Sequence, residues 1–112
     1  MGIDHRLACY GTLVPGRANH HQLAGLTGTW RPGQVRGTLL ATGWGAARGY
    51  PALFPDPAGD RVAVQLFESP DLPAHWDRLD DFEGSDYVRV PVEVETADGL
   101  VTAWLYAGAP KD

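Results

Sequence analysis

Residues 88–106 read VRVPVEVETADGLVTAWLY, and this stretch does most to decide the fold. From Val88 to Glu95, valines alternate with charged residues and one proline, which is the two-residue period of a strand with one buried face. The dipeptide Asp98-Gly99 favours a tight turn, and residues 100–106 then form a second apolar run. The sequence therefore predicts an antiparallel hairpin of two long strands.

The segment that precedes this hairpin predicts the main helix, over residues 72–82. Its apolar residues recur at the spacing of one helical face, namely Leu72, Trp76, Leu79 and Phe82. Pro73 suits the first turn of a helix, and Gly84 ends it. A shorter helical element is expected at residues 19–23, where Asn19 can serve as the N-cap.

Further strands are expected in the first two thirds of the chain. Residues 7–10 form an apolar run that ends at a glycine, and residues 61–68 alternate apolar and polar side chains. Residues 34–42 predict another strand, paired with the run before Arg31-Pro32-Gly33, which would form the turn. Residues 43–60 are rich in glycine and proline and predict an irregular loop. This order of elements indicates an α+β fold, with a mostly antiparallel sheet that curls into a small barrel or bends strongly around one main helix.

Composition limits the classes of function. The 112 residues are expected to form a single domain, residues 1–112. A net charge of -5 with scattered basic residues excludes the usual pattern of nucleic-acid binding. No run approaches the roughly 20 apolar residues of a membrane helix, so no membrane partner is expected. With Cys9 as the sole cysteine, no intramolecular disulfide can form, which fits a cytoplasmic location.

The first candidate site is the turn Tyr10-Gly11-Thr12-Leu13, directly after the first expected strand. Consecutive backbone N–H groups in such a turn can point at one place and bind a carboxylate or an oxyanion. Gly11 permits a backbone conformation that other residues rarely adopt. An ordinary strand-to-loop turn explains the same residues, and by residue type alone it is the commoner explanation.

The second candidate is Glu83, at the end of the expected helix. The negative end of the helix dipole disfavours a carboxylate there and raises its pKa, which suits a general acid or base. Tyr87 and Arg89 are two residues apart on a strand, so they share a face that can lie beside Glu83. The alternatives are a solvated glutamate and a surface arginine that pairs with Glu93 or Glu95.

The remaining histidines and the cysteine do not form the pattern of a metal site or of a reactive thiol. His20 and His21 are adjacent and lack the spaced His, Cys or Asp partners of a metal site. Cys9 lies inside an apolar run, as a core residue does. We therefore expect neither a metal nor a cofactor.

Four groups of residues follow one another in order along most of the chain: Tyr10-Gly11-Thr12-Leu13 with Gly16, Asn19-His20, Gly49-Tyr50-Pro51-Ala52-Leu53, and Leu79-Asp80-Asp81-Phe82-Glu83-Gly84 with Tyr87-Val88-Arg89. This series resembles the gamma-glutamylcyclotransferase-like family, and in particular its AIG2-like and gamma-glutamylamine cyclotransferase branch. The resemblance implies a small β-barrel, or strongly bent sheet, flanked by helices.

The resemblance also implies an enzyme whose substrate is a small gamma-glutamyl amine or gamma-glutamyl amino acid. In that reaction the α-amine attacks the γ-carbonyl of the same molecule, 5-oxoproline forms, and the amine or amino acid leaves. No metal or cofactor takes part. By resemblance Glu83 is the catalytic acid/base, and the substrate-binding residues are Tyr10, Gly11, Thr12, Leu13, Tyr50 and Tyr87.

Two other functions remain open at this point. The same turn can hold an acidic small molecule without catalysis, as a binding module. The chain can also be a structural or oligomer-forming domain whose pocket has no ligand. The oligomeric state does not follow from the sequence.

Overall fold

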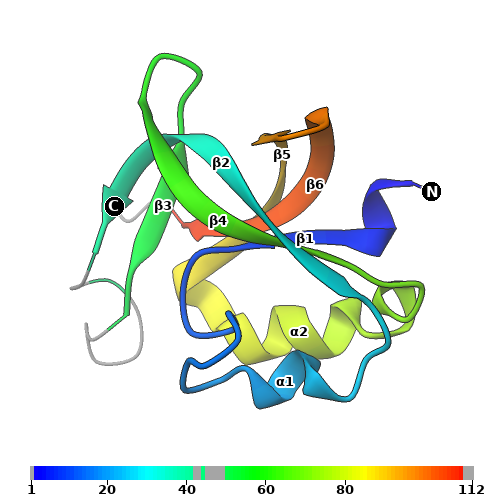
Figure 1. Cartoon of the computed structure of the whole chain (residues 1–112). Helices are drawn as coiled ribbons and strands as arrows, with labels where there is room; N and C mark the ends of the chain where they lie inside the picture. Colours follow the sequence, from blue (N-terminus) through cyan, green and yellow to red (C-terminus); the bar gives the residue numbers. More distant parts are fainter. Residues whose placement is uncertain (1, 42–43, 45–49, 110–112) are drawn as a thin grey trace.

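The structure, a computed structural model, describes residues 2–41, 44 and 50–109 (Figure 1). Its strands are β1 (Arg6–Cys9), β2 (Thr29–Leu40), β3 (Ala52–Pro55), β4 (Asp60–Glu68), β5 (Tyr87–Thr96) and β6 (Gly99–Gly108). Its α-helices are α1 (His21–Ala24) and α2 (Trp76–Glu83). Short 3-10 turns span Ile3–His5 (η1), Leu72–Ala74 (η2) and Gly84–Asp86 (η3).

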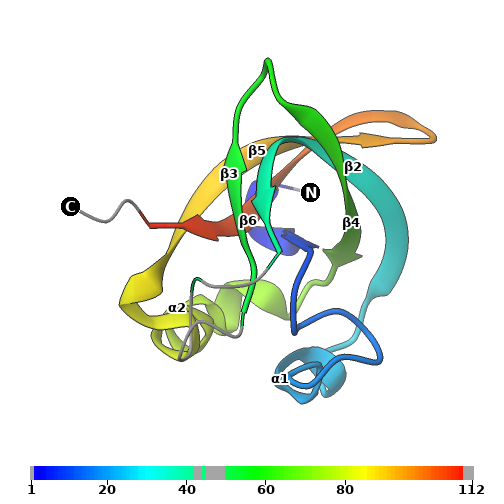
Figure 2. The ribbon, with the colours of Figure 1, turned by 90° about the vertical axis from the view of Figure 1, so that its left-hand side faces the viewer.

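Five of these strands close into a barrel, in the order β2, β4, β1, β6, β5 (Figure 2). The ring closes where Gln34 of β2 pairs with Glu95 of β5. β1 and β6 run parallel, whereas the other neighbouring pairs run antiparallel, and β3 pairs with β2 outside the ring. The expected small, mostly antiparallel barrel with one main helix is thus confirmed.

Two groups of buried side chains hold the barrel and the helices together. One fills the barrel and includes Val35, Leu66, Val94 and Leu105. The other lies between the barrel and the helices and includes Leu7, Leu23, Phe67, Leu72 and Leu79. Burying one such side chain contributes on the order of 1.5–3 kcal/mol. The second group therefore fixes α2, and the residue at its end, against the strands.

The C-terminal hairpin forms as the sequence predicts. β5 and β6 pair from Tyr87 with Gly108 to Thr96 with Gly99. Gly99 has φ of +110°, a conformation that favours glycine, and this explains the tight turn at Asp98-Gly99.

The main helix is shorter than expected. Residues 72–82 do not form one helix, because the turn η2 at Leu72–Ala74 is followed by a separate helix α2, which begins at Trp76. Leu79 is fully buried on the predicted face, but Phe82 is 37% exposed. Glu83 is the last residue of α2, and Gly84 ends the helix with φ of +74°.

Two predictions about the middle of the chain are wrong. Arg31-Pro32-Gly33 is not a turn but part of the continuous strand β2, in which Gly33 passes close to β5. A Cβ on Gly33 would lie 2.5 Å from a methyl group of Val94, so the glycine allows the barrel to close. Residues 43–60 are not all loop, since they contain β3. The expected end of the second strand, Thr42, lies outside the described residues.

Within residues 2–41, 44 and 50–109, no helix has the length and apolar character needed to cross a membrane.

Candidate active site

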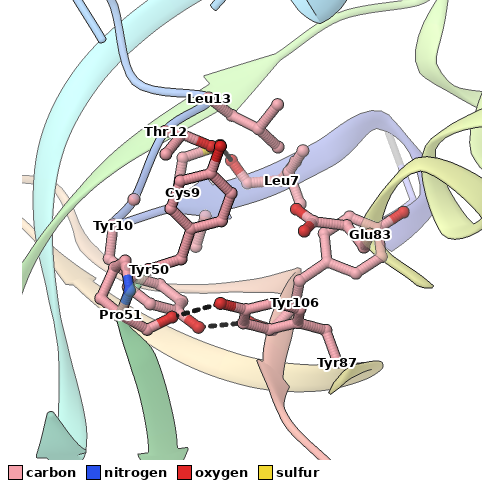
Figure 3. Close-up of a pocket in the computed structure, with 12 residues that line it drawn as sticks. Leu7, Cys9, Tyr10, Thr12, Leu13, Tyr50, Pro51, Glu83, Tyr87 and Tyr106 are labelled. Carbon is pink, nitrogen blue, oxygen red and sulfur yellow. Dashed lines mark hydrogen bonds between the residues drawn. The ribbon is translucent and has the colours of Figure 1, made fainter. Parts of the chain in front are cut away.

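A pocket opens beside the end of β1, between the turn that follows β1 and the C-terminal end of α2 (Figure 3). The described residues that line it come from β1, the following turn, the segment before β3, α2, β5 and β6. They are Leu7, Ala8, Cys9, Tyr10, Gly11, Thr12, Leu13, Tyr50, Pro51, Glu83, Tyr87 and Tyr106. Residues far apart in the sequence thus meet only once the barrel has closed.

The turn after β1, residues 10–13, carries three backbone N–H groups from which no described residue accepts a hydrogen bond. The carbonyl of Gly11 accepts a bond from Val14 N–H, that of Thr12 accepts one from Asn19 N–H at 2.9 Å, and that of Leu13 lies 3.0 Å from Nδ1 of His20. Among the described residues, no group accepts a hydrogen bond from N–H of residues 11, 12 or 13. These N–H groups are therefore available to an anionic ligand.

Gly11 does not play the conformational role expected of it. The glycines with positive φ among the described residues are Gly16, Gly84 and Gly99. A Cβ at position 11 would lie 3.4 Å from Cγ of Pro51, which is an ordinary van der Waals contact, so packing against Pro51 does not by itself require glycine there.

Glu83 is the one carboxylate among the described residues that line the pocket. Its side chain extends from the last turn of α2 toward the middle of the pocket (Figure 3). Burial raises the pKa of Glu83 from 4.5 to about 7. The direction of the shift agrees with the sequence-based expectation, and burial is its main cause. A carboxyl group with this pKa exchanges a proton readily near neutral pH.

The tyrosine rings line the pocket while their hydroxyl groups bond to the protein. Tyr10 Oη donates to the carbonyl of Tyr106 at 2.6 Å and accepts from Leu53 N–H at 3.0 Å. Tyr87 Oη donates to the carbonyl of Pro51 at 2.5 Å. Burial raises the pKa of Tyr10 far above its usual value, so its hydroxyl stays protonated. These two residues therefore offer mainly aromatic surface to a ligand.

A charged network that the sequence did not reveal lies behind the pocket. Tyr106 Oη donates to Asp80 Oδ1 at 2.7 Å, and Arg89 Nε and Nη2 donate to the two oxygens of Asp80 at 2.9 and 3.2 Å. The Arg89 guanidinium lies 4.5 Å from the ring centre of Trp76 and 4.6 Å from that of Trp104. The network ties α2 to β5 and β6 one helical turn before Glu83.

The contacts within this network determine the protonation of Asp80 and Tyr106. Burial alone would raise the pKa of Asp80, but the hydrogen bonds from Arg89 and Tyr106 outweigh it and lower that pKa. Burial, followed by the bond to Asp80, raises the pKa of Tyr106. Arg89 therefore belongs to this network rather than to the pocket lining, although it lies on the same strand as Tyr87.

All seven residues proposed from the sequence line the same pocket: Tyr10, Gly11, Thr12, Leu13, Tyr50, Glu83 and Tyr87. Sequence reasoning missed Tyr106, Pro51 and the position of Cys9 on the wall. Cys9 is buried as expected, and burial raises the pKa of its thiol.

Asn19 is not an N-cap; its side chain bonds to Thr12 and Tyr50 instead. Gly49 of the third motif lies outside the described residues.

The described residues bring no three His, Cys, Asp or Glu side chains together as a metal site would require. The described wall of the pocket thus combines three backbone N–H donors with one partly buried carboxylate.

Residues 7–112 match the family model described as gamma-glutamyl cyclotransferase, AIG2-like, and the chain belongs to that family. No curated protein matches the sequence. Among solved structures, YkqA from Bacillus subtilis is 27% identical with a TM-score of 0.70; the match covers 93% of this chain and 35% of YkqA. The chain thus spans about a third of the length of YkqA.

Two further structures share the fold at lower identity. An AIG2-like protein from Mus musculus is 23% identical with a TM-score of 0.73, and the match covers 96% of this chain and 79% of that one. A gamma-glutamyl cyclotransferase is 18% identical with a TM-score of 0.70, over 96% of this chain and 68% of that one. The family match supports a gamma-glutamyl cyclotransferase-like role, and these two structures show that the fold is shared.

Proposed function

We propose that the protein releases 5-oxoproline from a gamma-glutamyl amine or gamma-glutamyl amino acid, with Glu83 as the general acid and base. The observation that carries the proposal is the position of this carboxylate: among the described residues of the wall it is the sole acid, and its pKa is raised to about 7. Membership of the family supports the reaction class.

Substrate binding would use the turn after β1. The backbone N–H groups of Gly11, Thr12 and Leu13 have no acceptor in the part of the chain that the structure describes, and they suit the α-carboxylate of the substrate. The rings of Tyr10, Tyr50 and Tyr87 would enclose the chain of methylene groups. Folding the flexible substrate so that amine and carbonyl meet supplies part of the acceleration, because both groups belong to one molecule.

The chemistry needs one group that can take up a proton and return it. Ionised Glu83 takes a proton from the α-ammonium group, and the free amine then attacks the γ-carbonyl carbon. A new C–N bond closes the five-membered lactam. As the original amide C–N bond breaks, Glu83 returns its proton to the departing nitrogen. The ring nitrogen loses its second proton to the departing amine, which leaves as an ammonium ion, and the lactam N–H is neutral. General acid–base catalysis of this kind contributes about 10²–10⁴-fold in rate.

The test is a 5-oxoproline assay with a panel of gamma-glutamyl amines and gamma-glutamyl amino acids. We expect release by the wild type and a loss of about 10²–10⁴-fold in Glu83→Gln, with Glu93→Gln, an exposed residue on β5, as the matched control. Equal rates in Glu83→Gln and wild type would contradict the role of Glu83. A folded wild type that binds these compounds without releasing 5-oxoproline would indicate the alternative, a non-catalytic module for acidic small molecules.

A further inference from the structure

Asn19 lies just outside the pocket, and its side-chain amide contacts two hydroxyl groups of the pocket wall. Nδ2 donates to Thr12 Oγ1 at 2.9 Å and to Tyr50 Oη at 3.4 Å. Both hydroxyl-bearing residues line the pocket, and Figure 3 shows the hydroxyl end of Tyr50 beside Thr12. Asn19 is itself held in place, because its backbone N–H donates to the carbonyl of Thr12 at 2.9 Å.

The direction of these bonds decides what the hydroxyl groups can do. An amide NH₂ can only donate, so Thr12 Oγ1 and Tyr50 Oη must both act as acceptors toward it. Each hydroxyl hydrogen is then left for a different acceptor. No described group accepts a hydrogen bond from either hydroxyl, which leaves both hydrogens available on the pocket side.

We infer that Asn19 is a positioning residue that turns Thr12 and Tyr50 into donors and so makes this end of the pocket selective for a carboxylate over a neutral amide. With the backbone N–H groups of Gly11, Thr12 and Leu13, the two hydroxyl groups then give this end of the described wall five hydrogen-bond donors. A carboxylate, which only accepts, satisfies all of them. A carboxamide at the same place would direct its NH₂ group at the donors of the wall, and some of these donors would then lack an acceptor.

The selectivity is measured with two ligands that cannot cyclise, because they lack the α-amine. One is the monomethylamide of glutaric acid, an anion, and the other is the corresponding neutral diamide, in which a carboxamide replaces the carboxylate. Calorimetry gives the dissociation constants, and the ¹⁵N–¹H signals of residues 11–13 report where each ligand binds. The inference rests on the proposed function only for the choice of these ligands.

We expect the wild type to bind the anion at least tenfold more tightly than the diamide. Thr12→Val and Tyr50→Phe each remove one donor and should weaken binding of the anion about tenfold, with little effect on the diamide. Asn19→Asp replaces the donor by an acceptor, which captures both hydroxyl hydrogens and adds a negative charge. It should abolish the preference for the anion.

A double variant separates hydroxyl orientation from charge. In the Asn19→Asp protein the Thr12 hydroxyl is already turned away, so adding Thr12→Val should weaken anion binding no further. A further loss of about tenfold, as in the wild-type background, would overturn the inference. Thr12→Val and Tyr50→Phe proteins that bind the anion as wild type would also overturn it, since the amide of Asn19 would then present its oxygen to the hydroxyls.

The folding of each variant is checked by its melting temperature, and Thr12→Val, which keeps the side-chain shape, still tests the inference if Asn19→Asp does not fold. A wild type that prefers the anion but releases no 5-oxoproline would support the role of Asn19 and contradict the proposed reaction. A wild type that binds both ligands equally, or neither, would overturn the role of Asn19 whatever the reaction.

Discussion

Replacing Glu83 by glutamine should make the protein more stable at pH 8 and leave its stability unchanged at pH 4. Burial raises the pKa of Glu83 from 4.5 to about 7, so the folded state holds the proton more tightly than the unfolded state does. The stability that the neutral carboxyl provides is fully present below pH 4.5 and is lost as the pH rises through 7. Glutamine is neutral throughout and does not lose it.

The size of the effect follows from the same two pKa values. A difference between 4.5 and about 7 corresponds to at most about 3 kcal/mol, at about 1.36 kcal/mol for each pH unit. Glu83 is only partly buried, and solvent screens part of this energy, so we expect about 1–2 kcal/mol above pH 8. For a domain of this size that is a rise in Tm on the order of 5–10 °C.

The measurement is urea denaturation of both proteins at several values between pH 4 and pH 9. The control is Glu93→Gln, the same exchange at an exposed position, against which the effect of Glu83→Gln is compared at each pH. A Glu83→Gln effect that is the same at both ends of this range would refute the reasoning from burial. A variant that is less stable than wild type at pH 8 would show that the ionised carboxylate makes a favourable contact.

Three further predictions concern the site and its support. Asp80→Asn should lower the free energy of unfolding by about 1–2 kcal/mol, because it removes the charge that Arg89 and Tyr106 hold; the neighbouring, exposed Asp81→Asn should change it by less than about 0.5 kcal/mol. If the proposed reaction is correct, kcat/KM should fall below pH 7 as Glu83 takes up a proton, and a profile flat from pH 5 to pH 8 would contradict its role as base. Cys9, buried and with a raised thiol pKa, should react with a maleimide only after denaturation, and rapid labelling of the native protein would show that this wall opens.

The hairpin and the residues that line the pocket could be picked out because their signals in the sequence are local. Alternating valines and Asp98-Gly99 determine the two last strands without reference to the rest of the chain. The turn after the first strand and the glutamate before a helix-ending glycine are equally short patterns. The prediction that these residues share one site came from the resemblance to a family. Local sequence patterns do not indicate that residues 11 and 83 lie close together in the fold.

The wrong predictions concern features that depend on the closed barrel. Pro32-Gly33 is a common turn signal. Here the glycine instead allows β2 to pass close to Val94 on β5, where a Cβ would not fit. β3 is four residues long and pairs on one side with β2, which its sequence alone does not indicate. The bond from Arg89 to Asp80 joins residues nine apart on different elements, and a surface pair with Glu93 or Glu95 fits the sequence equally well.

The turn that joins β3 to β4 lies at the end of the barrel far from α2 in both views (Figure 1, Figure 2). Its residues 56–59 are closed by a bond from Gly59 N–H to the carbonyl of Asp56 at 2.8 Å, and they contribute nothing to the pocket wall. The pocket therefore lies near α2, and this turn lies at the other end of the barrel. A fluorescent protein or a second binding domain inserted into this turn should therefore leave the pocket unchanged. The turn is a suitable site for insertions in engineered versions of the protein.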